Sequence, residues 1–320
     1  MNAPVLKIIG LFSLLILASC STDIKVHRED PVRQIQWSKA VTPHAMLSLL
    51  TYHGEGNGDV RPGPVAKVQS EMPANEDDLV DDCRRRLANE GWRRIESFTG
   101  QKETVSAGLY FEVWEKTGPS REVVFAFRGT DFKEWDDWRS NARWFRLLRK
   151  RNGEGSDQYD TVHRECLRIH KRLRESSGGD KILFSTTGHS LGGGLAQHVF
   201  YSCLPQMDRA IVFDTSPVTG YRDLEKAQQL QFQRSVYRET FPSYRILRIH
   251  EKGEVLEYVR NFTQSFFKLD NLIRAVEFRS VQRGNFIAKH SIAMLTSKIL
   301  MTAMIAEEKI AEEKKKALNQ

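Results

Sequence analysis

The feature that most constrains the fold is a Gly-x-Ser-x-Gly motif at residues 188–192, which stands between a β-like run at 182–187 and a helix-like stretch. In such a strand–turn–helix the turn is so tight that side chains at Gly188 and Gly192 would collide with neighbouring backbone. The turn lifts the serine clear of the sheet, as a nucleophile requires. We therefore predict that Ser190 is a nucleophile rather than an incidental residue of a glycine-rich loop.

Segments with strand and helix patterns alternate along most of the chain. The strand patterns cover residues 104–116, 121–128, 182–187, 209–213 and 244–250. The helix patterns cover residues 37–53, a segment beginning at Asn75, residues 160–176 and residues 291–313. Alternation from about residue 104 onward predicts an α/β fold, with a mostly parallel central sheet flanked by helices.

A serine nucleophile needs a histidine base, and chain order restricts the choice. In this architecture the partners follow in the order Ser, acid, His. Of nine histidines, only His250 and His290 lie beyond the helix that follows Ser190. His250 ends a strand pattern, where the acid is expected. His290 lies at a loop-to-helix junction with the exposure that proton transfer needs. We predict that His290 is the base; the alternative is a surface histidine that caps a helix.

The acid should follow the strand that precedes His290. A turn through Gly253 would direct Glu254 inward, which makes Glu254 the first candidate. Asp214, at the end of the preceding strand, is the alternative acid, and Glu251 is a third candidate. The acid holds the imidazole tautomer and stabilises its charged form, so a glutamate can serve.

The oxyanion of an acyl-transfer reaction needs two N–H donors. One comes from the residue after the nucleophile, here Leu191. The second should follow a central strand, and Thr130 stands there after Gly129, where the backbone can turn tightly. Taken alone, Arg128 to Thr130 would be a simple turn. With the serine motif some sixty residues later, we predict that Thr130 and Leu191 form an oxyanion hole.

Three motifs together resemble the class 3 (fungal-type) lipases. They are Phe-Arg-Gly-Thr at 127–130, Gly-His-Ser-Leu-Gly-Gly at 188–193, which includes His189, and Phe-Asp-Thr-Ser-Pro-Val-Thr-Gly at 213–220. The resemblance covers about residues 100–295. It implies an α/β-hydrolase fold, no cofactor and hydrolysis of carboxylic esters of lipids. By position, Ser190 takes the family's nucleophile role, Thr130 and Leu191 its oxyanion role, and His290 its base.

The chain departs from that family at the acid. Glu254 in Gly-Glu-Val-Leu stands where the family has Asp in an Asp-x-Val-Pro context, and Asp214 replaces a glycine of the third motif. Residues 131–150, which contain three tryptophans, fall where the family carries its lid helix. We expect part of this segment to cover the site and to contact lipid.

The N-terminus predicts a lipoprotein. Residues 1–19 have a lysine followed by an apolar run too short to cross a bilayer, and they end before Cys20 in Leu-Ala-Ser-Cys, which resembles a bacterial lipobox. The alternative is a buried N-terminal helix with a chance cysteine. We expect a lipid anchor on Cys20, a tether over 20–36, a hydrolase domain over 37–306 and a charged helical tail over 307–320. Ser21 favours the outer membrane over the inner membrane.

The net charge and the cysteine spacing restrict the kinds of ligand and partner that the chain is expected to bind. The net charge of +7 is spread along the chain, which suits an anionic lipid surface and disfavours nucleic acid. The cysteines other than Cys20 show no metal spacing, and no metal is predicted; at least one should be a buried thiol. We predict a serine hydrolase of lipid esters. The alternatives are an inactive lipid-anchored envelope protein, and a thioesterase, peptidase or short-chain esterase with the same triad.

Overall fold

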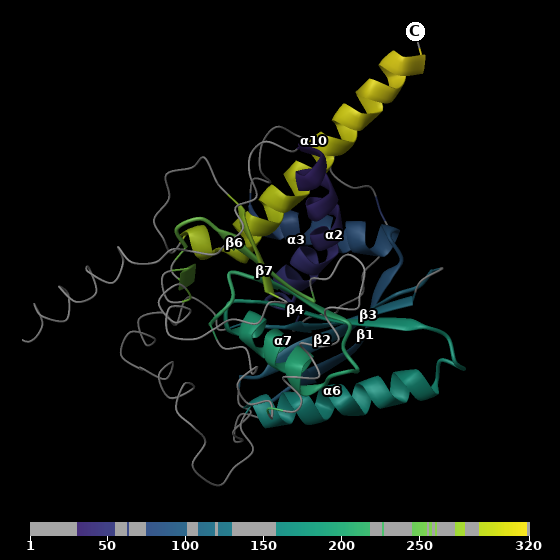
Figure 1. The fold of residues 1–320 in the computed structure, drawn as a ribbon, viewed down its shortest axis with the longest axis vertical. Coiled ribbons are helices and arrows are strands. Elements are labelled where there is room, and N and C mark those ends of the chain that lie inside the picture. The colour runs from purple at the N-terminus through teal and green to yellow at the C-terminus, as the bar shows by residue number, and fades with distance from the viewer. Residues whose placement is uncertain are drawn as a thin grey trace, which may run out of the picture.

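The computed structural model is built around one seven-stranded sheet (Figure 1). It describes residues 31–54, 63, 75–100, 108–118, 121–129, 158–217, 226, 245–254, 256–257, 260, 273–278 and 288–318. Cys20, Thr130 and the segment 131–150, on which three predictions depend, lie outside the described residues.

The sheet is mostly parallel, and its strands follow one another in chain order. They are β1 (Trp92–Thr99), β2 (Tyr110–Lys116), β3 (Arg121–Phe127), β4 (Ile182–His189), β5 (Arg209–Phe213), β6 (Ile246–Glu251) and β7 (Ile273–Phe278). The β1–β2 and β2–β3 pairs are antiparallel, and every pair from β3 to β7 is parallel. Val123 to Phe127 of β3 are buried, because helices cover both faces of a central parallel strand. The predicted fold class is confirmed.

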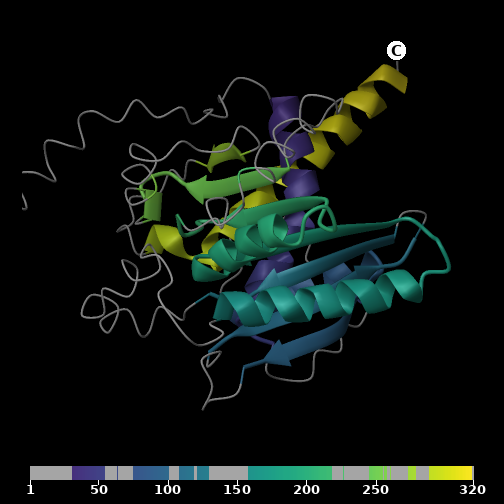
Figure 2. The same cartoon turned by 60° about the horizontal axis from the view of Figure 1, so that its bottom comes forward.

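Helices cover both faces of this sheet (Figure 2). One face packs against α6 (Gln158–Glu175) and α7 (Leu191–Ser202), whose apolar side chains share a core with Phe125 and Phe184. The other face packs against α2 (Pro31–Leu50), α3 (Glu76–Asn89) and α10 (Ile292–Leu318). Alternate residues of each strand contribute to the two cores, as the twofold period of a strand requires.

The sequence analysis missed the two edge strands. β1 carries charged residues at three of its eight positions, and β7 mixes apolar residues with Arg274 and Glu277. Edge strands bury less side-chain surface than central strands, so their apolar pattern is weak. β2 also begins later than expected, at Tyr110, and α2 begins earlier, at Pro31.

The C-terminal helix α10 continues beyond the expected end at residue 313, to Leu318 (Figure 1). Its first half packs on the sheet through Leu295 and Ile299, whereas Ile305 and Ile310 are exposed. No described helix combines the length and the apolar character that a membrane span requires.

The cysteines Cys83, Cys166 and Cys203 are all buried and free. The predicted buried thiol is therefore confirmed. Burial raises the pKa of all three thiols, so they remain protonated at neutral pH and act as small apolar side chains.

Candidate active site

Ser190 lies at the sharp turn between β4 and α7. Its backbone has φ 56° and ψ −123°, a conformation that L-residues rarely adopt and that stores strain. The turn is fixed to the end of β5, because the Ser190 N–H donates to the Phe213 carbonyl at 3.1 Å and the Ser190 carbonyl accepts from the Ser216 N–H at 3.0 Å. The hydroxyl makes no capping bond to α7. The expected strand–turn–helix around Ser190 is therefore present.

The glycines of the motif allow this turn to close. A Cβ atom at Gly188 would lie 2.5 Å from the backbone of Gly192, and a Cβ atom at Gly192 would collide with the backbone that follows β3. These are backbone contacts that no side-chain rotation can relieve.

The end of β3 lies directly over the serine. A Cβ atom at Gly129 would be 3.2 Å from the Ser190 Cβ and 2.6 Å from the His189 carbonyl oxygen. Leu191 is the first residue of α7, so its N–H has no partner within the helix. Gly129 and Leu191 thus flank Ser190 on two sides, while Thr130 itself lies outside the described residues.

His290 and Glu254 are joined by a direct hydrogen bond. His290 ends the short helix η3 (Ala288–His290), just before α10, and its Nδ1 donates to the Glu254 Oε2 at 2.7 Å. Gly253, with φ 75°, turns the chain after β6 so that Glu254 points inward and is fully buried. The structure therefore brings together the two residues that the sequence analysis chose as base and first acid candidate.

Glu254 is held in its ionised form. Its Oε1 accepts from the Arg260 Nη2 at 2.6 Å, and its Oε2 also accepts from the Leu256 N–H at 2.7 Å. Burial alone would raise the pKa of Glu254, but Arg260 and the hydrogen bonds from His290 and Leu256 lower it to about 2. Arg260 is itself fixed by a 2.7 Å bond from its Nη1 to the Thr215 carbonyl.

His290 is more buried than the sequence analysis expected. The expectation was an exposed junction residue, but the side chain is fully buried, which corrects that expectation. Burial lowers the pKa of His290, and the hydrogen bond to Glu254 partly offsets this effect. The ring is therefore neutral at pH 7. This is the state that a general base needs before it accepts a proton.

The two other candidate acids occupy different positions. Asp214, with φ 40°, accepts a hydrogen bond from the Glu251 N–H at 3.0 Å and is fully buried. Burial and the nearby charge of Glu254 raise the pKa of Asp214 well above its usual value, which favours the neutral form of the side chain. The Glu251 carboxylate pairs instead with Lys298 of α10 at 3.2 Å. Of the three candidate acids, Glu254 is the one whose carboxylate is hydrogen-bonded to the His290 Nδ1.

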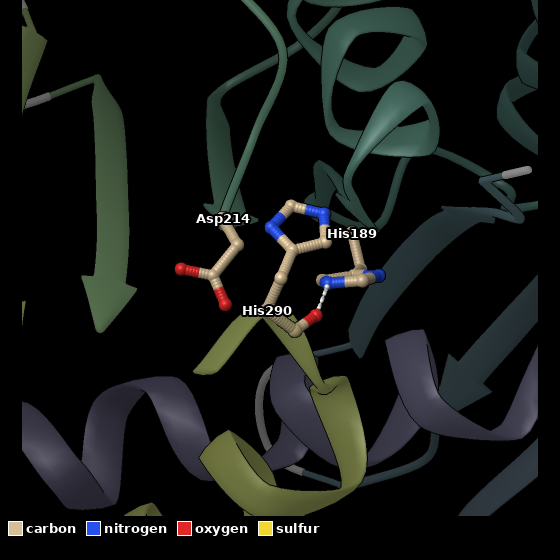
Figure 3. Close-up of side chains that lie close together, drawn as sticks. All are labelled: His189, Asp214 and His290. Atoms are coloured by element: carbon tan, nitrogen blue, oxygen red, sulfur yellow. Dashed lines mark hydrogen bonds between the residues drawn. The ribbon is translucent and has the colours of Figure 1, made fainter. Parts of the chain in front are cut away.

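His189, the residue before the serine, fixes the backbone of His290 (Figure 3). Its Nε2 is 2.9 Å from the His290 carbonyl and its Nδ1 is 2.9 Å from the Tyr52 hydroxyl. Because a carbonyl only accepts, Nε2 carries the proton and Nδ1 accepts from Tyr52. His189, Asp214 and His290 each offer one potential metal-ligand atom, and these three atoms lie within 4.8 Å of one another. His189 uses both nitrogens in hydrogen bonds, however, so it has no lone pair for a metal.

Three residues that support the site were not found from the sequence in these roles. Arg260 and Tyr52 were not considered, and His189 was taken only as part of the serine motif. The only available signal was that His189 precedes the serine. Arg260 lies six residues after Glu254, and Tyr52 lies over a hundred residues before Ser190, so only the folded chain relates them to the site.

Comparison with known proteins identifies one matching family model. A phospholipase-like family model, described as a Tle-like phospholipase domain, matches residues 78–259. The match includes Ser190 and Glu254 and ends before His290. No curated protein is significantly similar to the chain in sequence.

Solved structures of lipases and esterases resemble the chain distantly. Lipase II from Rhizopus niveus has 15% identity and a TM-score of 0.43, with 72% of this chain and 77% of that chain covered. The M37 lipase has 14% identity and a TM-score of 0.39, with 82% and 79% covered. An esterase from Pyrococcus furiosus has 12% identity and a TM-score of 0.32, with 78% and 100% covered.

The family match covers more than half of the chain and includes the strand–turn–helix around Ser190. The sheet, the helices on its two faces and the serine at the end of β4 have the α/β-hydrolase arrangement. The chain therefore belongs to the phospholipase-like family of Tle-like phospholipase domains, within the lipase-type α/β-hydrolases.

Proposed function

We propose that this protein hydrolyses carboxylic esters of lipids through a Ser190–His290–Glu254 triad. The observation that carries the proposal is the 2.7 Å hydrogen bond between His290 and Glu254, in a site where the strand–turn–helix holds Ser190 in a strained conformation. A buried carboxylate that is held ionised orients the imidazole and stabilises its positive form. The phospholipase-like family match supports a lipid ester as the substrate.

The proposed reaction has two acyl-transfer steps. His290 accepts the proton of the Ser190 hydroxyl while its oxygen attacks the ester carbonyl, and the N–H groups of Leu191 and Thr130 bind the resulting oxyanion. The C–O bond to the alcohol breaks as His290 returns the proton to the leaving oxygen. Water then attacks the acyl-enzyme with the same proton transfers and releases the fatty acid.

Within lipid esters, we favour a glycerophospholipid over a triacylglycerol. The family match and the net charge of +7 support this choice, because a basic protein is attracted to anionic lipid surfaces. The class 3 lipase resemblance of residues 127–130, 188–193 and 213–220 is compatible with either substrate. The reaction expected is cleavage of an acyl ester and not of the phosphodiester.

Labelling with an alkyl fluorophosphonate tests the nucleophile. We expect stoichiometric labelling of the full chain and none of Ser190→Ala, because the reagent reacts with activated serine hydroxyls. Ser185, buried in β4, provides a control, since Ser185→Ala should keep the label. Labelling that persists in Ser190→Ala would remove Ser190 from the mechanism, and a parent chain that takes no label would favour the inactive binding protein.

Lipid products separate the substrate classes. Incubation with phosphatidylglycerol vesicles should release fatty acid and lysophospholipid, both identifiable by mass spectrometry, and Ser190→Ala should release neither. Faster turnover of trioleoylglycerol would favour a lipase, and activity confined to soluble thioesters or short p-nitrophenyl esters would favour the alternative activities.

We also propose that the mature chain is an outer-membrane lipoprotein that begins at Cys20. The support is the lysine, apolar run and Leu-Ala-Ser-Cys sequence of residues 1–20, with Ser21 in the following position. The tether, hydrolase domain and charged tail follow over 20–36, 37–306 and 307–320. Mass spectrometry of the N-terminal peptide should find acyl chains on Cys20 and none in Cys20→Ser, where the precursor should remain uncleaved.

A further inference from the structure

A second group of ligand-type side chains lies where β6 and β7 end, and the proposed reaction does not use it. His250, Glu257 and Glu277 each offer one ligand atom, and these atoms lie within 4.8 Å of one another. His250 of β6 and Glu277 of β7 are register partners in adjacent parallel strands (Figure 1), so their side chains project from the same face of the sheet. Glu257 follows the turn that carries Glu254.

His250 is the residue that points to a ligand. Its side chain is 3% exposed, and its Nε2 has no hydrogen-bond partner among the described residues. A buried polar atom without a partner costs about 1–3 kcal/mol, so its presence in a native fold requires an explanation. A bound cation accounts for it, because a neutral imidazole nitrogen donates its lone pair to a metal.

The donor set selects the kind of metal. One imidazole nitrogen with two carboxylate oxygens suits Zn²⁺ and related transition-metal ions, whereas Ca²⁺ and Mg²⁺ prefer oxygen ligands alone. Zinc–ligand bonds of about 2.0–2.2 Å place ligand atoms roughly 3.4 Å apart in a tetrahedral site. The present separations, all within 4.8 Å, are compatible with this spacing after small movements of the Glu257 and Glu277 side chains.

Two existing contacts are compatible with a metal. Lys252 Nζ lies 3.9 Å from the Glu277 Oε1, but Lys252 is 51% exposed and a divalent ion would displace it. One oxygen of Glu257 accepts a hydrogen bond from the Gly253 N–H, and the carboxylate has a second oxygen for a metal.

We propose that His250, Glu257 and Glu277 form a zinc-binding site, with water completing the coordination. His250, Glu257 and Glu277 form no recognised metal-spacing motif, so the site could not be predicted from the sequence. His250 and Glu257 lie on either side of Glu254 in the chain, and Glu277 lies on the neighbouring strand. The metal would therefore join β6, β7 and the turn that carries Glu254 and stabilise that turn.

Calorimetric titration of ZnCl2 into chelator-treated full chain tests the site. The titration is made in the Ser190→Ala background, so that its outcome does not depend on whether the chain is an ester hydrolase. We expect one zinc ion per chain, and at least a tenfold loss of affinity in both His250→Gln and Glu277→Gln. Zinc should raise the Tm of the parent, and this increase should be absent from both variants.

An exposed histidine–carboxylate pair provides the matched control. His53 Nε2 lies 3.1 Å from the Glu76 Oε1 at the surface, so His53→Gln removes an adventitious binding position and should leave the titration unchanged. If His250→Gln does not fold, Glu277→Gln is the remaining test, because the Glu277 side chain is less buried than that of His250. Zinc binding that is undiminished in Glu277→Gln, or that is lost in His53→Gln, would overturn the proposal, as would a parent that binds no zinc.

Discussion

Glu112 and Glu254 are both buried carboxylates that accept three hydrogen bonds, but they differ in the kind of donor. Glu112 of β2 accepts from Arg94, from the Tyr110 hydroxyl and from the Trp114 Nε1 at 2.7–2.8 Å. All of these donors keep their protons at neutral pH. Glu254 accepts from an arginine and a backbone N–H, but its third donor is a histidine.

This difference separates a structural carboxylate from a candidate catalytic one. Burial and an arginine partner are common to both sites, so neither marks function. Only the carboxylate bonded to His290 contacts a side chain that can accept a proton near pH 7 and return it. If this difference in donors decides activity, substitutions at Glu254 should abolish turnover and matched substitutions at Glu112 should not.

The largest effect is expected for Glu254→Gln. The amide keeps the size of the side chain but removes the charge that stabilises protonated His290, so kcat should fall roughly 10⁴-fold, as in other triads. The measurement is kcat on a p-nitrophenyl ester. Asp214→Asn should change kcat far less, because the His290 Nδ1 is hydrogen-bonded to Glu254 and not to Asp214. The reverse order would assign the acid role to Asp214.

Glu112→Gln is the matched substitution at the other site. Each Gln variant leaves a buried or partly buried arginine without its carboxylate, so both should lose about 3 kcal/mol of unfolding free energy in urea denaturation. Only Glu254→Gln should also lose kcat, and folded Glu112→Gln should remain within a few-fold of the parent. A folded Glu112→Gln as inactive as Glu254→Gln would show that the two sites do not differ as proposed.

Arg260→Gln should move the acid limb of the activity profile to higher pH. Removing the guanidinium raises the pKa of Glu254 from about 2, and it also raises the pKa of His290, which Arg260 lowers. With both pKa values raised, Glu254 and His290 become protonated at a higher pH than in the parent. The limb of kcat/KM should shift by roughly 1–3 pH units. Arg94→Gln, the equivalent change beside Glu112, should leave the limb in place.

The same pKa predicts how stability depends on pH. Glu254 has a folded pKa of about 2, below its ordinary value of 4.5, so its ionisation stabilises the fold fully above pH 4.5. This contribution is lost as the pH falls from 4.5 toward 2. Melting curves over that range should show a smaller loss of Tm in Glu254→Gln than in the parent. An equal loss in the two chains would contradict the assigned pKa.

The smallest effect is expected for Tyr52→Phe. It removes one hydrogen bond to His189, worth about 1 kcal/mol, which corresponds to a roughly fivefold fall in kcat if His189 positions His290. KM should not change, because Tyr52 is not proposed to contact the substrate. Phe at this position should leave the unfolding free energy within about 1 kcal/mol. An unchanged kcat would limit His189 to a structural role.

The sequence predicted the parts of the site that depend on local chemistry. The strand, the glycines and the helix around Ser190 are adjacent in the chain, and Gly253 made the inward turn of Glu254 predictable. Arg260 and Tyr52 enter through tertiary packing, which no short pattern encodes. His290 was wrongly expected to be exposed, because a loop-to-helix junction in the sequence says nothing about what packs over it.

The dependence of sequence prediction on local patterns also explains which strands were found and which were missed. Central strands β3 to β6 have apolar runs that a sequence reveals, because both of their faces are covered. The edge strands β1 and β7 mix charged and apolar residues and resemble loops until their neighbours are known.

The backbone of Ser190 implies that activity and stability oppose each other at this residue. A φ of 56° with ψ −123° suits glycine, so glycine at position 190 would relieve the backbone strain. An inactive Ser190→Gly chain should thus melt at a higher temperature than the parent. The backbone conformation therefore favours glycine at this position, whereas the proposed nucleophile requires a hydroxyl there.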